Sequence, residues 1–174
     1  MSESKELNVN DWITLSSVMI GAVLTILALI WQATPTRGIV SASFLLLISF
    51  IFFVNSVTTN SKAKFEAISG KTSETKVKQW ITFAEYSFGI GFTLVVCGFS
   101  ILGYEYLMDF TSQGLLALLL PIVYIAITII VMFIYNFINS GSPIGNLKRN
   151  IWVIIELAVL VLIILDFLAV IIIP

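Results

Sequence analysis

Long runs of apolar positions alternate with short polar stretches along the whole chain. A helix in lipid must satisfy its own backbone polar groups, and it needs about 20 mostly apolar residues to cross the bilayer. Five runs reach that length without Lys or Arg: Ile13–Trp31, Ile39–Val57, Ile81–Tyr104, Leu115–Phe137 and Ile151–Ile173. We therefore expect an all-α integral membrane protein, with residues 1–174 forming one membrane domain of five transmembrane helices.

Residues 58–80, between the second and third runs, form the one sizeable polar connection. The pair Ser69-Gly70 is typical of a helix C-terminus, and Thr72 or Ser73 can cap the helix that follows. These signals predict a helical hairpin that projects beyond the bilayer, with the second helix continuing to about Ser69 and the third beginning near Glu74. The alternative is a solvated linker. Five apolar side chains would stabilise the hairpin: Ala63, Phe65, Ala67, Ile68 and Val77.

The distribution of basic residues predicts the orientation of the chain. With a cytoplasmic N-terminus, eight bases fall on the inner side and only Arg37 falls outside. The eight are Lys5, Lys62, Lys64, Lys71, Lys76, Lys78, Lys148 and Arg149. This split follows the positive-inside rule, and five crossings then place the C-terminus outside. Short loops and the lack of processing signals favour a prokaryotic cytoplasmic membrane.

Composition narrows the function classes. The chain is 59% hydrophobic and 11% charged, against about 25% charged residues in a soluble domain. It has no His and one cysteine, Cys97, so it cannot build a Cys/His zinc site, a haem site or an internal disulfide. Catalytic motifs are also lacking, and we expect neither an enzyme nor a cofactor. A net charge of −1 gives no surface for nucleic acid.

Three acids inside the apolar runs are the most informative residues: Glu85, Glu156 and Asp166. A carboxylate at the bilayer centre costs roughly 2.5–3.5 kcal/mol on insertion scales, so each acid requires a partner. Helix rise places Glu85 and Glu156 about 10 Å from mid-membrane on the cytoplasmic side, in one layer. Asp166 falls about 6 Å beyond the middle, towards the outside.

Three interpretations of these acids remain open. Glu85 and Glu156 can extend towards the inner interface, with Asp166 protonated and hydrogen-bonded inside the bundle. Alternatively, the acids bind a permeating cation or relay protons. In the third interpretation they meet a base on the helix of a partner protein.

Small residues and a proline indicate how the helices pack. Close packing in lipid favours Gly, Ala, Ser and Thr at helix interfaces. The first run carries such a stripe at Ser17, Gly21, Thr25 and Ala28, and the third carries Ala84, Gly91 and Gly98 at heptad spacing. Both stripes predict central helices, although small residues can also line a pore. Pro121 predicts a kink in the fourth helix.

Two functional classes follow for this protein in its lipid bilayer. The first is a homo-oligomeric channel or small transporter for cations or protons that uses Glu85, Glu156 and Asp166. The alternative is a non-catalytic accessory or anchoring subunit of a membrane complex. Such a subunit would dock other membrane subunits through its acids or through five lysines of the connection: Lys62, Lys64, Lys71, Lys76 and Lys78.

Overall fold

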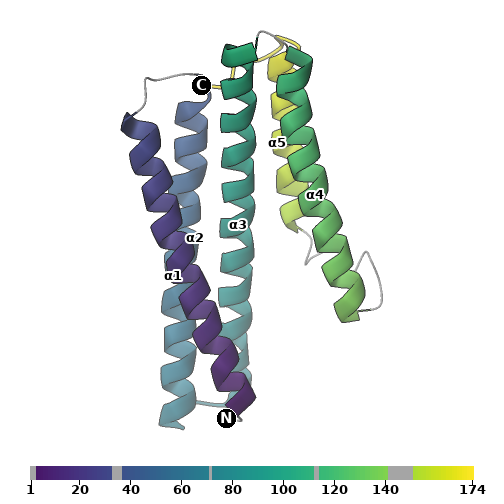
Figure 1. The fold of residues 1–174 in the computed structure, drawn as a ribbon. Helices are drawn as coiled ribbons and strands as arrows, with labels where there is room; N and C mark the ends of the chain where they lie inside the picture. Colours follow the sequence, from purple (N-terminus) through teal and green to yellow (C-terminus); the bar gives the residue numbers. More distant parts are fainter. Residues whose placement is uncertain (1–2, 33–36, 71, 112–113, 141–150) are drawn as a thin grey trace. The chain divides into compact units, whose positions relative to one another are not determined.

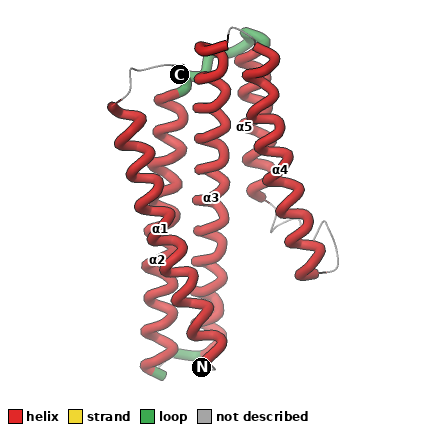
Figure 2. The backbone as a smooth tube through the Cα atoms, viewed as in Figure 1, coloured by secondary structure: helices red, strands yellow, loops and turns green. Residues whose placement is uncertain are grey.

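The computed structural model describes residues 3–32, 37–70, 72–111, 114–140 and 151–174. Figure 2 shows helices and loops over these residues and no strand. The helices are α1 (Glu3–Gln32), α2 (Ile39–Ser69), α3 (Glu74–Thr111), α4 (Gly114–Ser140) and α5 (Ile151–Phe167). The all-helical prediction is confirmed. Helices α1 to α4 are each long and apolar enough to cross a membrane, which indicates a membrane location.

The helix expected over Ile151–Ile173 ends early, at Phe167. Its 17 residues rise about 25 Å, less than the roughly 30 Å hydrocarbon core. The chain leaves α5 through two hydrogen bonds, from Val170 N to Leu165 O (2.9 Å) and from Ala169 N to Asp166 O (2.8 Å). This is the Schellman pattern, which requires a left-handed residue, and Ala169 has a φ of 57°.

Contacts divide the chain into two compact units that share the long helices α2 and α3. The first unit holds residues 1–33 and 46–94, and the second holds residues 34–45 and 95–174. The division does not follow the helix boundaries, because α2 and α3 each contribute residues to both units.

Polar and aromatic contacts join three helices in the first unit, which are drawn in purple to teal in Figure 1. The Ser16 hydroxyl of α1 donates to Ser56 Oγ of α2 at 3.1 Å. Asn55 Nδ2 of α2 donates to Ser87 Oγ of α3 at 2.7 Å. The Phe88 ring of α3 packs edge-on against Trp12 of α1, with ring centroids 5.0 Å apart. Each pair of helices is therefore linked by a specific contact.

The buried side chains of α2 form one line along the helix, called here the buried line, and several of them are polar. Six residues, spaced alternately three and four apart, are at most 1% exposed: Leu46, Ser49, Phe53, Ser56, Asn60 and Ala63. Alternate spacing of three and four places side chains on one helical stripe. Three of the six are polar. Ser56 accepts an interhelical hydrogen bond, which helps to hold a bundle in lipid together, whereas the Ser49 hydroxyl donates to Leu46 O of its own helix. Neither polar atom of the Asn60 side chain has a partner among the described residues.

The predicted helical hairpin is confirmed in its helix boundaries, with α2 ending at Ser69 and α3 beginning at Glu74. Gly70 has a φ of +64°, and the Ser73 carbonyl accepts the first hydrogen bonds of α3. Ala63 and Val77 are buried as expected, whereas Phe65 and Ile68 are exposed. The expectation for these two was wrong because they lie off the buried line, two and five residues after Ala63.

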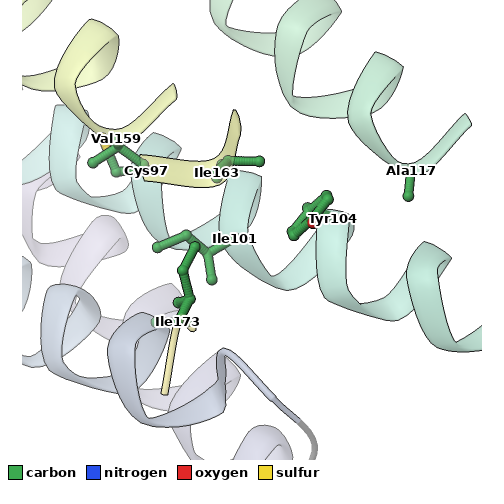
Figure 3. Packing of buried hydrophobic residues seen from close by; sticks show 8 residues of the cluster. Cys97, Ile101, Tyr104, Ala117, Val159, Ile163 and Ile173 are labelled. Carbon is green, nitrogen blue, oxygen red and sulfur yellow. The ribbon is translucent and has the colours of Figure 1, made fainter. Parts of the chain in front are cut away.

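The second unit packs α4 against α5, which lie side by side in Figure 1. The face of α4 that is buried carries Ala117, Pro121 and Ile125, each four residues apart. Figure 3 shows the apolar cluster of this unit, in which Cys97 lies next to Val159. Helix α4 continues through Pro121 from Gly114 to Ser140.

Candidate functional site

Glu156 is the most unusual side chain of the second unit. It is fully buried, and neither carboxyl oxygen has a hydrogen-bond partner among the described residues. Glu156 shares the buried face of α5 with Val159 and Ile163, three and seven residues further on. Helix packing therefore turns this acid inwards, because the apolar residues on the same face must be covered.

Two other helices bring titratable groups near Glu156. The Cys97 thiol of α3 and the Tyr124 hydroxyl of α4 both lie close enough to the Glu156 carboxyl group to interact with it electrostatically. Cys97 is fully buried, whereas Tyr124 is 38% exposed. Glu156 therefore lies where α3, α4 and α5 meet.

Asp166 lies on the same helix, in its last turn, and has partners. Tyr104, fully buried on α3, donates its hydroxyl proton to Asp166 Oδ2 at 3.0 Å. The backbone N–H of Ile173 donates to Asp166 Oδ1 at 2.9 Å. This second bond holds the chain that follows α5 against Asp166. The last residue is held as well, because Pro174 O accepts a 3.0 Å hydrogen bond from Ser41 N in the first turn of α2.

Glu105 is another buried acid near Asp166, although it was not among the candidate acids expected from the sequence. It is 3% exposed, and its Oε1 has no hydrogen-bond partner among the described residues. Asp166 and Arg37 both lie within Coulombic range of its carboxyl group. Glu105 follows Gly98 by seven residues, so continuing the stripe Ala84, Gly91 and Gly98 by one heptad would have identified it.

Gly38 makes room for Glu105. Gly38 has a φ of +72°, and a Cβ at this position would lie 2.6 Å from Glu105 Cγ and 2.9 Å from Ile101 Cγ2. Only glycine combines this backbone conformation with so close an approach. A side chain at position 38 would therefore clash with the buried Glu105 side chain.

Glu85 lies in the first unit, on an exposed face of α3. Phe83, two residues earlier, and Tyr86, the next residue, are also exposed. Glu85 belongs to the first unit, whereas Glu156 and Asp166 belong to the second, so a shared site for the three predicted acids stays a prediction. The structure brings Asp166 together with Glu105 and Tyr104.

The two small-residue stripes have different surroundings. Ala84, Gly91 and Gly98 are all buried, and the Phe53 ring packs against Gly91. The stripe of α1 lies on an exposed face: Ser17, Gly21, Thr25 and Ala28. The Ser17 and Thr25 hydroxyls donate to their own backbone, at Ile13 O and Gly21 O. A role of this second stripe in packing stays a prediction.

The lysines of the hairpin also differ from one another. Lys62 Nζ lies 4.2 Å from the Trp80 ring centroid and 3.9 Å from Glu66 Oε1. Lys64 Nζ donates to Asn10 Oδ1 at 3.0 Å. Lys76 and Lys78 are exposed, and Lys71 lies outside the described residues. Docking through these lysines stays a prediction.

The second unit also contains a mostly apolar cavity of about 290 Å³. Its lining includes Phe44, Leu162 and Ile172. Glu105, Glu156 and Asp166 do not contribute to the lining. Among the described residues, no three His, Cys, Asp or Glu side chains come together as a set of metal ligands.

Comparisons of the chain with protein-family models, with curated proteins and with solved structures find no match.

Proposed function

We propose that this small multi-pass membrane protein moves a cation or a proton across the bilayer, and that Glu156 binds the species in transit. The proposal rests on one observation, the complete burial of a carboxyl group without a hydrogen-bond partner among the described residues. An ionised carboxyl in such a place costs several kcal/mol unless a positive species compensates its charge. Acids of this kind inside membrane helices mark ion pathways and proton relays.

The surroundings of Glu156 support a binding role that is transient. Tyr124 on α4 is partly exposed, so the neighbourhood of the acid is not closed off completely. Pro121, one turn earlier on α4, has no N–H to donate to the Ala117 carbonyl, which weakens the helix locally. Both features allow α4 to yield when a species enters or leaves.

Flux in reconstituted vesicles tests the proposal. Purified protein in liposomes should dissipate an imposed cation or proton gradient, and Glu156→Gln should reduce the flux to that of empty vesicles. Glu85→Gln is the matched control, because it removes the same charge from an exposed position in the other unit. Its flux should equal that of the parent protein. Full activity of Glu156→Gln, after confirmation that it folds, would exclude the proposal.

We also propose that the active form is a homo-oligomer, because a single bundle of five helices rarely encloses a pathway alone. Native mass spectrometry of the protein in mild detergent tests this directly. A discrete oligomer of the chain supports the proposal, and a monomer that still catalyses flux contradicts it.

The accessory-subunit alternative has a specific observation in its favour. Glu85 is exposed between two exposed aromatic residues, and an acid on the outer face of a membrane helix suits a basic partner helix. In this case a foreign subunit should co-purify. Reversing Lys76 and Lys78, which are exposed, should release it, whereas replacing both with Arg should not. Co-purification that survives the reversal excludes these two lysines as the dock.

A further inference from the structure

We infer that the species bound at Glu156 is a proton and not a metal ion. This inference rests on the proposed function and specifies its substrate. It comes from the groups that surround the carboxyl and from the way the remaining acids of the unit are arranged.

The donor set at Glu156 suits a proton. Ca²⁺ in proteins takes six to eight oxygen ligands, and potassium filters replace the hydration shell with several carbonyl oxygens. Among the described residues, the titratable groups near Glu156 are the Cys97 thiol and the Tyr124 hydroxyl. Among the described residues, Glu156 is not part of any set of three His, Cys, Asp or Glu side chains that could hold a metal ion, whereas a proton needs only a single carboxyl oxygen.

The packing beyond Glu156 is apolar. Val159 and Ile163 are the next buried residues on its face of α5, and both belong to the cluster with Cys97 and Ile101 shown in Figure 3. A hydrated metal ion cannot pass such a cluster without large rearrangement. A proton can pass along a few transient water molecules, because each transfer moves only one hydrogen.

Polar groups reappear at the other end of this cluster. Asp166 follows Glu156 by ten residues, which is a rise of about 15 Å along α5. There the Tyr104 hydroxyl is already hydrogen-bonded to Asp166, and Glu105 lies within Coulombic range with an unpartnered, buried oxygen. On α4, the Ala117 carbonyl lacks its usual N–H donor because of Pro121, so it can accept a hydrogen bond from water.

The transfer is therefore a relay between two carboxyl positions. The O–H bond of protonated Glu156 breaks and its proton passes to water. The carboxylate that remains then takes a proton from the opposite side, which restores the neutral form. Asp166, held by two donors, and Glu105 receive the proton at the far end.

Ion-selective flux measurements test the inference separately from the proposed function. Vesicles with an internal pH dye should acidify or alkalinise under a valinomycin-imposed potential, and Glu156→Gln should abolish the change. The rate should be unaffected when external Na⁺ is replaced by choline, and a Ca²⁺ dye should report no entry. Transport of Na⁺, K⁺ or Ca²⁺ that depends on Glu156 would overturn the inference and leave the proposed function standing. No flux of any ion would overturn both.

Carbodiimide labelling provides a readout that needs no flux. An apolar carbodiimide reacts with a protonated carboxyl group in an apolar place, and mass spectrometry of peptides locates the adduct. We expect modification of Glu156 at low pH that declines as the pH rises, and equal labelling with and without added Na⁺ or Ca²⁺. Protection of Glu156 by either metal ion would contradict a proton site. Asp109 serves as the internal control, because it is exposed and takes no part in the relay.

Discussion

The Tyr104 hydroxyl donates a 3.0 Å hydrogen bond to Oδ2 of Asp166, which links the second half of α3 to the last turn of α5. The other oxygen of Asp166 accepts the Ile173 N–H, so one carboxyl group holds both a neighbouring helix and the returning chain. An acid that looks exceptional in the sequence is therefore a structural connector as well as the candidate end of a relay.

Replacing Tyr104 with Phe should destabilise the second unit by about 1 kcal/mol, since it removes a single hydrogen bond and little apolar contact. Unfolding in mixed micelles titrated with sodium dodecyl sulfate measures this change. Tyr106→Phe is the control, because Tyr106 is exposed and its ring stacks on Phe110. Equal effects of the two substitutions would show that the Asp166 contact contributes nothing.

Ala169→Gly should stabilise the protein by about 1 kcal/mol. A left-handed conformation costs roughly 1–2 kcal/mol for a residue with a Cβ, and glycine avoids that cost. The same substitution at the exposed, helical Ala158 should lower stability by up to about 1 kcal/mol. Opposite signs in the thermal midpoints of the two variants are the expected result, and two losses would argue against the left-handed cap.

Gly91→Ala should destabilise the first unit by roughly 1–3 kcal/mol, the range for overpacking a close-packed site. The added Cβ would lie 3.1 Å from Phe53 Cε1 and 3.3 Å from Phe52 Cβ. At Gly21 no atom lies within 4 Å of the added Cβ, so Gly21→Ala should gain up to about 1 kcal/mol from helix propensity. A stabilised Gly91→Ala variant would contradict the packing described here.

Gly21→Leu tests whether the exposed stripe of α1 is an interface. The added side chain has free space within the described chain, so folding should be unaffected. If a second helix covers the stripe, the substitution should reduce the oligomer seen by native mass spectrometry at least several-fold. An unchanged oligomer would exclude the stripe from the interface.

Asn60 and Asn55 form a matched pair of buried or partly buried amides. Neither polar atom of the Asn60 side chain has a partner among the described residues, whereas Asn55 donates to Ser87 at 2.7 Å. Asn60→Leu should therefore be neutral or stabilising, while Asn55→Leu should cost about 1 kcal/mol. Chemical unfolding of both variants distinguishes these outcomes. A large loss at Asn60 would indicate that water or another polar group satisfies its amide.

Much of the fold could be predicted from the sequence, because lipid permits few solutions. Uninterrupted apolar runs predicted the four long helices, and Ser69-Gly70 predicted the end of α2. The end of α5 could not be predicted, since its cap uses Ala169 in place of glycine and leaves no signal in the pattern. The division into two units was also hidden, because α2 and α3 pass through both without a break.

The candidate site was predicted only in part. Glu156 and Asp166 were evident as acids in an apolar run. Glu105 was missed because the third span was ended at Tyr104, one residue before it. The stripe of α1 illustrates a further limit. The small residues of α1 lie on one face of the helix, and the apolar residues Val9 and Val23 lie on another. The sequence alone does not show which of the two faces is buried, because that depends on how the helices pack.

The buried line of α2 has a consequence for the shape of the first unit. Its alternation of three and four residues averages 3.5, whereas a straight α-helix has 3.6 residues per turn and would drift by about 20° per heptad. A line of this spacing favours a left-handed supercoil of the helices that cover it. The line runs on through Asn60 and Ala63, past the predicted end of the second span at Val57, and α2 is unbroken there. A torque applied at the hairpin would therefore turn α2 as a whole, because the helix offers no joint in which to absorb it.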